Sequence, residues 1–125
     1  YFGRDGIARR LRDHIAMARW LAERVDAEPG WERVAPVPFG TVVFRRAPEG
    51  AGPEEQDRES EAVLEAVNAT GRVFLSHTRL RERFCLRLSI GNLRTTPAHV
   101  ERAWNILREA AAGVAEGVRP RPGFS

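Results

Sequence analysis

Residues 84–104 read FCLRLSIGNLRTTPAHVERAW, and this stretch decides how the chain folds. Large apolar residues occupy every second position from 84 to 90, which is the period of a strand with one buried face. Gly91 tolerates turn geometry and ends the strand. Thr96 followed by Pro97 is typical of a helix start, because a hydroxyl caps the helix and proline suits its first position. The stretch therefore predicts a strand, a tight turn and a helix.

Arg87 is the unusual residue of this strand, because it lies on the face opposite the large apolar side chains. A buried guanidinium without a partner would cost several kcal/mol, so we expect Arg87 to meet an anionic group. It is our one candidate site residue, with Ser89 and His77 as candidate neighbours, and the face that carries Arg87 and Ser89 would also carry either His77 or Thr78. We expect no catalytic, cofactor-binding or metal-binding residue in this chain.

The same periodicities assign the rest of the chain. The element order is helix, strand, strand, helix, strand, strand, helix. This order predicts an α+β fold, in which a small four-stranded, mostly antiparallel sheet carries its helices on one face. The predicted helices span 5–26, about 54 or 56 to 69, and 97–117. The predicted strands span 31–37, 41–46, 72–78 and 84–90, with a charged connection at 78–83.

The length of 125 residues suits one domain, which we place at 1–118, followed by a tail at 119–125. Residues 47–57 combine prolines, glycines and acidic residues, which predicts a mobile surface loop. Trp20 and Met17 add more apolar surface to the first helix than a small sheet can cover. We therefore expect this helix to pack against a further domain, and the start without methionine suggests a piece of a longer protein.

Composition argues against several classes of function. All 20 basic residues are arginine, and they are interleaved with 17 acidic residues, so no basic face for nucleic acid is expected. Salt-sensitive binding to an oligonucleotide would instead favour a nucleic-acid-binding protein that uses its arginines. No apolar run approaches the ~20 residues of a membrane helix. The single cysteine, Cys85, cannot form an internal disulfide, which suits the cytoplasm.

Motifs for self-contained chemistry are missing from the sequence. It has no glycine-rich phosphate loop and no zinc-ligand spacing. Cys85 could act as a nucleophile with His77 or His99 as its base. A cysteine in the middle of a strand is more commonly a small packing residue, which is the interpretation we favour.

Short motifs spread along nearly the whole chain carry a resemblance to a known family. They are Tyr1-Phe2-Gly3, Gly6-Ile7, His14, Trp31-Glu32, Val42-Val43-Phe44-Arg45, Phe84 to Asn92, Arg94-Thr95-Thr96, His99-Val100 and Ala103-Trp104. With these motifs the chain resembles the C-terminal small domain of the group II pyridoxal-phosphate (PLP)-dependent decarboxylases, and most of all the aromatic-L-amino-acid decarboxylases.

The resemblance implies a homodimeric, cytoplasmic fold-type I enzyme that removes the α-carboxylate of an aromatic L-amino acid as CO2. It also implies that a large domain binds PLP through a lysine, which this chain lacks entirely. The chain alone should therefore be inactive. Arg87 would lie in the crevice between the domains, either near the substrate carboxylate or in an ion pair with the large domain. Tyr1 does not match the mobile-loop tyrosine of the family.

The alternative is a stand-alone small α+β module that binds a ligand or a partner protein. Such a module should fold alone and bind without a cofactor, whereas a decarboxylase domain would leave an apolar surface bare.

Overall fold

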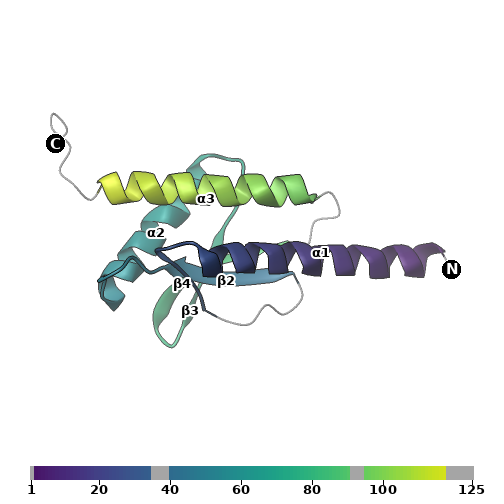
Figure 1. Ribbon diagram of the computed structural model, residues 1–125, viewed down its shortest axis with the longest axis horizontal. Coiled ribbons are helices and arrows are strands. Elements are labelled where there is room, and N and C mark those ends of the chain that lie inside the picture. Colours follow the sequence, from purple (N-terminus) through teal and green to yellow (C-terminus); the bar gives the residue numbers. More distant parts are fainter. Residues whose placement is uncertain (1, 35–39, 91–94, 118–125) are drawn as a thin grey trace.

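The computed structural model describes residues 2–34, 40–90 and 95–117, and this part of the chain forms a four-stranded sheet with three helices (Figure 1). The predicted α+β class and the predicted order of elements are confirmed. The predicted tail at 119–125 and the predicted first strand beyond residue 34 lie outside the described residues. The elements are α1 (Phe2–Ala27), β1 (Trp31–Arg33), β2 (Thr41–Arg46), α2 (Pro53–Ala69), β3 (Ser76–Leu80), β4 (Arg83–Ser89) and α3 (Pro97–Gly117).

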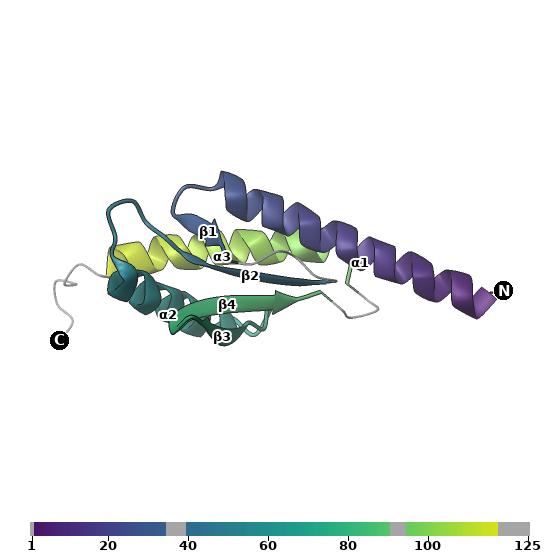
Figure 2. The same ribbon diagram turned by 90° about the horizontal axis from the view of Figure 1, so that it is seen from below.

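The strands lie in the order β1-β2-β4-β3, and every neighbouring pair is antiparallel. Phe44 pairs with Leu86 and Val42 with Leu88, and all four side chains are buried. These residues face α1 and α2, which pack on one side of the sheet, and α3 lies against both helices (Figure 2). The alternation of residues 84–90 thus sets the core face as predicted.

Three aromatic side chains join the helical layer to the sheet. The Trp31 ring lies 5.7 Å from the Phe44 ring and 5.3 Å, edge-on, from the Trp104 ring of α3. Tilted and edge-to-face pairs of this kind contribute about 0.5–1.5 kcal/mol each beyond the area they bury. Trp31 and Trp104 are only 8% and 4% exposed, so α3 is held on the sheet through an apolar contact.

The start of α3 is capped as the sequence predicts. The backbone N–H of His99 donates to Thr96 Oγ1 at 3.3 Å, and the backbone N–H of Thr96 donates to His99 Nδ1 at 3.2 Å. This is a reciprocal capping box with histidine in the place usually taken by glutamate. A cap of this kind contributes about 1 kcal/mol and fixes where the helix begins.

The second hairpin differs from the prediction. Strand β3 spans Ser76–Leu80 rather than 72–78, because the Asn68 side chain holds the backbone of Leu75 outside the sheet. Asn68 Nδ2 donates to the Leu75 carbonyl at 2.9 Å, and Asn68 Oδ1 accepts from the Leu75 N–H at 2.7 Å. The expected charged connection at 78–83 is a two-residue turn in which Arg81 and Glu82 have φ of 51° and 65°. Two left-handed residues match the twist of a hairpin.

The expected loop at 47–57 is shorter than predicted. Pro53 is the first residue of α2, so residues 53–57 are helical and only 47–52 connect β2 to the helix. Proline suits the first helical position, and Glu54 and Glu55 in the first turn favour the positive end of the helix dipole. The acidic run that suggested a loop is therefore a helix start.

Gly40, just before β2, binds the backbone of Ile90, just after β4. Its carbonyl accepts from the Ile90 N–H at 2.6 Å, and a Cβ at Gly40 would lie 2.4 Å from the Ile90 carbonyl oxygen. Only glycine permits this approach of the two backbones.

Within the described ranges, no helix is both long and apolar enough to span a bilayer.

Candidate functional site

The face of the sheet opposite the helices, which we call the open face, carries the predicted site residue. Helices α1 and α2 both pack on the other side, so the described part of the chain places no helix over this face. Successive residues of a strand alternate between the two faces of the sheet, and directly paired residues of antiparallel strands share a face. The open face consists of Thr41, Val43 and Arg45 of β2, Cys85, Arg87 and Ser89 of β4, and Ser76, Thr78 and Leu80 of β3.

Arg87 lies in the middle of the open face and is exposed. Val43 of β2 and Ser76 of β3 flank it across the two ladders. The structure records no ion pair of Arg87 with any acidic residue in the described ranges, although it records one for the neighbouring Arg45, whose Nε lies 3.1 Å from Glu32 Oε2. Arg87 is therefore an exposed cation on the open face.

The two candidate neighbours of Arg87 fall on different faces. Ser89 is exposed on the open face, two residues along the same strand, and pairs with Thr41. His77 pairs with Leu86, so the expectation that it shares a face with Arg87 is wrong. Its ring stacks on Phe84 instead, with 5.1 Å between centroids and 11° between planes.

The open face carries serine and threonine residues near Arg87 in place of the expected histidine. The register brings Ser76 and Thr78 of β3 to the open face beside Ser89, and Thr78 agrees with the prediction. Ser76 follows from Thr78 by alternation, whereas the choice between Thr78 and His77 depends on the register, which the turn at Arg81 and Glu82 sets. Arg87 thus shares its face with short hydrogen-bonding side chains, and an arginine side chain can bind a carboxylate by two parallel bonds.

The structure does not bring Cys85 together with either of its candidate bases, His77 and His99. Cys85 is fully buried, and its thiol contacts the Arg83 carbonyl oxygen at 3.5 Å. His77 lies on the opposite face, and His99 belongs to the cap of α3. No group of three His, Cys, Asp or Glu side chains that could hold a metal ion occurs among the described residues. Among the described residues, Cys85 therefore has neither His77 nor His99 as a partner base.

Comparison with known proteins identifies decarboxylases of plants. No family model matches the chain. Tyrosine decarboxylase 2 of Arabidopsis thaliana is 33% identical over 111 residues, which cover 89% of this chain and 20% of the relative. Phenylacetaldehyde synthase of Arabidopsis thaliana is also 33% identical over 111 residues, covering 89% of this chain and 23% of that protein. The chain thus spans about a fifth of the length of the relatives it matches, at their C-terminal region.

A solved structure agrees with this similarity. The crystal structure of Oryza sativa TDC with PLP and tryptamine superposes with a TM-score of 0.79 at 28% identity, covering 84% of this chain and 23% of that one. The described fold is that of the small domain in PLP decarboxylase structures. The resemblance to the C-terminal domain of aromatic-amino-acid decarboxylases, expected from the sequence, is confirmed.

Proposed function

We propose that the complete protein is a PLP-dependent decarboxylase that removes the α-carboxylate of an aromatic L-amino acid as CO2, and that this chain is its C-terminal small domain. The similarity to tyrosine decarboxylase 2 along 89% of the chain carries the proposal. The relatives are several times longer than the chain, which supports a domain of an enzyme over a stand-alone module.

This chain cannot hold PLP as a Schiff base. A Schiff base with the cofactor needs the amine of a lysine, and the sequence contains none. The cofactor therefore belongs to the large domain of the same enzyme, and this chain alone should be inactive. Homodimeric assembly and a cytoplasmic location stay predictions.

Arg87 is the residue of this chain that we expect to contact the substrate or the large domain in the complete enzyme. Its guanidinium is exposed in the middle of the open face and has no acidic partner within the described ranges. An arginine fork fits a carboxylate with two hydrogen bonds. In the complete enzyme that carboxylate belongs either to the substrate, which Arg87 would orient, or to an acidic residue of the large domain, which Arg87 would hold in place.

The substrate class is tested with the complete enzyme loaded with PLP. We expect CO2 release from Tyr, Trp, Phe or dopa, and at least roughly tenfold lower kcat/KM for glutamate, because burying a second carboxylate in an aromatic-ring site without a partner costs 1.4 kcal/mol or more. CO2 release is measured for each amino acid, with the 125-residue chain as the inactive control. Preference for glutamate would contradict the aromatic class, and CO2 release by the 125-residue chain would contradict its role as a domain fragment.

A further inference from the structure

The arginines of the open face differ in whether a carboxylate neutralises them. Glu32 of β1 pairs directly with Arg45 of β2 and so lies on the same face. Arg45 Nε donates to Glu32 Oε2 at 3.1 Å, and Arg83 Nε, at the start of β4, donates to Asp57 Oδ1 of α2 at 3.2 Å. Of these three arginines, Arg87 alone has no ion pair recorded within the described ranges.

Arg45 lies diagonally across the ladder from Arg87. Val43 pairs with Arg87, and Arg45 follows Val43 by two residues on the same face of β2. Diagonal neighbours of an antiparallel pair have their Cβ atoms roughly 7 Å apart, which is within reach of long side chains. The two guanidinium groups can therefore approach one ligand that carries two carboxylates.

Glu32 holds the Arg45 guanidinium on the side away from Arg87. The strands lie in the order β1-β2-β4-β3, so Glu32 and Arg87 lie on opposite sides of Arg45. The Arg45 side chain is only 15% exposed, so its attraction to the carboxylate is partly shielded from water. The ion pair thus leaves the open face with one free cation, Arg87, where two would otherwise be available.

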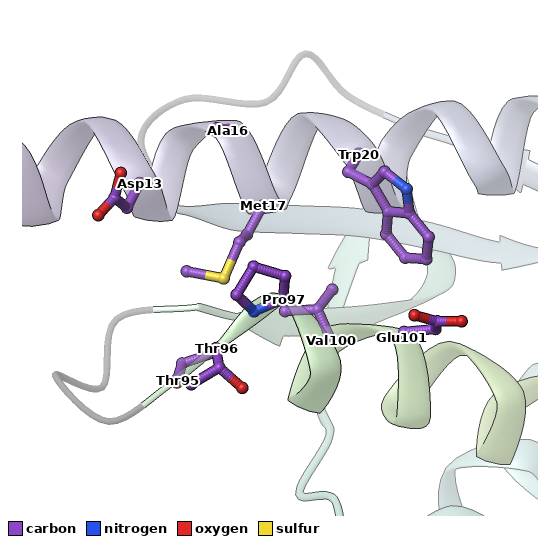
Figure 3. A pocket seen from close by; sticks show the side chains of 9 residues that line it. All are labelled: Asp13, Ala16, Met17, Trp20, Thr95, Thr96, Pro97, Val100 and Glu101. Carbon is purple, nitrogen blue, oxygen red and sulfur yellow. The ribbon is translucent and has the colours of Figure 1, made fainter.

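The groove between α1 and the beginning of α3 offers an anion no such partner (Figure 3). It has a volume of about 620 Å³, and its two charged lining residues, Asp13 and Glu101, are both acidic. Carboxylates repel a further carboxylate. The open face is therefore better suited to bind an anionic ligand than this groove.

We propose that Glu32 determines substrate specificity in the complete enzyme, because it neutralises Arg45 and leaves Arg87 to bind a single carboxylate. This inference rests on the proposed function, with the substrate as the partner of Arg87. An amino acid with a second carboxylate is then rejected, since burying that group without a partner is costly. Glu32 acts through Arg45, so it is a positioning residue.

Glutamate is the amino acid that a freed Arg45 would favour. Four carbon–carbon bonds of about 1.5 Å each join its two carboxylate carbons, so these atoms lie within roughly 6 Å of each other. Arg87 can bind one carboxylate of such a ligand while Arg45, no longer held by Glu32, binds the other. Each contact is of the charge-assisted kind that an arginine fork makes best.

Glu32→Gln in the complete enzyme, loaded with PLP, tests the proposal. L-Glutamate and L-glutamine are compared as competitive inhibitors of CO2 release from an aromatic L-amino acid, because they differ in charge at nearly equal size. We expect the inhibition constant of glutamine divided by that of glutamate to rise at least roughly tenfold in the variant. Tenfold is about 1.4 kcal/mol, the lower end of what a hydrogen bond to a charged group contributes.

Two further variants separate this effect from general damage to the sheet. Asp26→Asn removes the ion pair in which Arg33 Nη2 lies 2.9 Å from Asp26 Oδ2, and Arg33 pairs with Phe44 of the core face, so the ratio should not change. Adding Arg45→Met to Glu32→Gln should return the ratio to the wild-type value, because the freed cation is then absent.

An unchanged ratio in Glu32→Gln would overturn the proposal. So would a raised ratio that Arg45→Met does not reverse, or an equal rise in Asp26→Asn. The proposed function is judged separately, by CO2 release from the wild-type enzyme with the aromatic amino acid alone.

Discussion

Replacing Glu59 with alanine is expected to lower the free energy of unfolding by about 3–5 kcal/mol, because it leaves the buried Arg46 guanidinium without its partner. Arg46 Nε donates to Glu59 Oε1 at 2.8 Å, and only 11% and 9% of the two side chains is exposed. The same guanidinium lies 4.8 Å from the Trp31 ring. Equilibrium unfolding in urea, followed by tryptophan fluorescence, measures the loss.

The surroundings of Arg46 explain why the loss should be large. Its backbone N–H donates to Ser60 Oγ at 2.9 Å, so the strand and α2 are joined at two adjacent helix residues. Gly30, with φ of 86°, lets the chain pass close by, since a Cβ there would lie 2.9 Å from Nη1 of Arg46. The Glu59 carboxylate, the Trp31 ring and the backbone at Gly30 thus enclose the side chain.

Two variants separate this ion pair from general damage to α2. Glu61 is exposed on the same helix, so Glu61→Ala should change stability by less than about 0.5 kcal/mol. Arg46→Met combined with Glu59→Leu should recover most of the loss, because an apolar pair of similar volume carries no unpaired charge. Similar losses for Glu59→Ala and Glu61→Ala would contradict the role of the ion pair.

Replacing Arg87 with lysine in the complete enzyme should lower kcat/KM by roughly 10- to 1000-fold if its partner is the substrate carboxylate. That loss corresponds to about 1.4–4 kcal/mol of transition-state stabilisation. Lysine keeps the charge but cannot make two parallel hydrogen bonds to one carboxylate. The melting temperature should barely change, because Arg87 is exposed in its own domain.

The same variant distinguishes the other role of Arg87. If the partner is an acidic residue of the large domain, the melting temperature should fall and the folded enzyme should keep most of its kcat/KM. Arg79→Lys is the control, since Arg79 is exposed on β3 and pairs with Phe84 of the core face. Normal kinetics together with normal stability would remove Arg87 from both roles.

The elements that depend on local signals could be predicted from the sequence. Thr96-Pro97 marked the start of α3, and Gly71, with φ of 71°, follows the end of α2. The alternation through Leu86 and Leu88 identified the core face of β4 and left Arg87 on the other face. Each of these signals acts over a few residues, so no distant contact can change its meaning.

The misplaced features depend on contacts that sequence patterns do not reveal. Asn68 delays β3 by binding the backbone of Leu75, seven residues later. The turn at Arg81 and Glu82 has no glycine or asparagine to announce its left-handed residues, and it sets the register that places His77 away from Arg87. The interaction of Arg46 with Glu59 joins a strand to a helix and leaves no periodic signal.

The central claim is that this chain completes a decarboxylase of aromatic amino acids. It is tested most directly by measuring CO2 and amine together as the complete enzyme, loaded with PLP, acts on an aromatic L-amino acid. We expect one amine for each CO2. Because a phenylacetaldehyde synthase is as similar to this chain as a tyrosine decarboxylase, aldehyde in place of amine would contradict the account, and so would the absence of CO2 from every aromatic substrate.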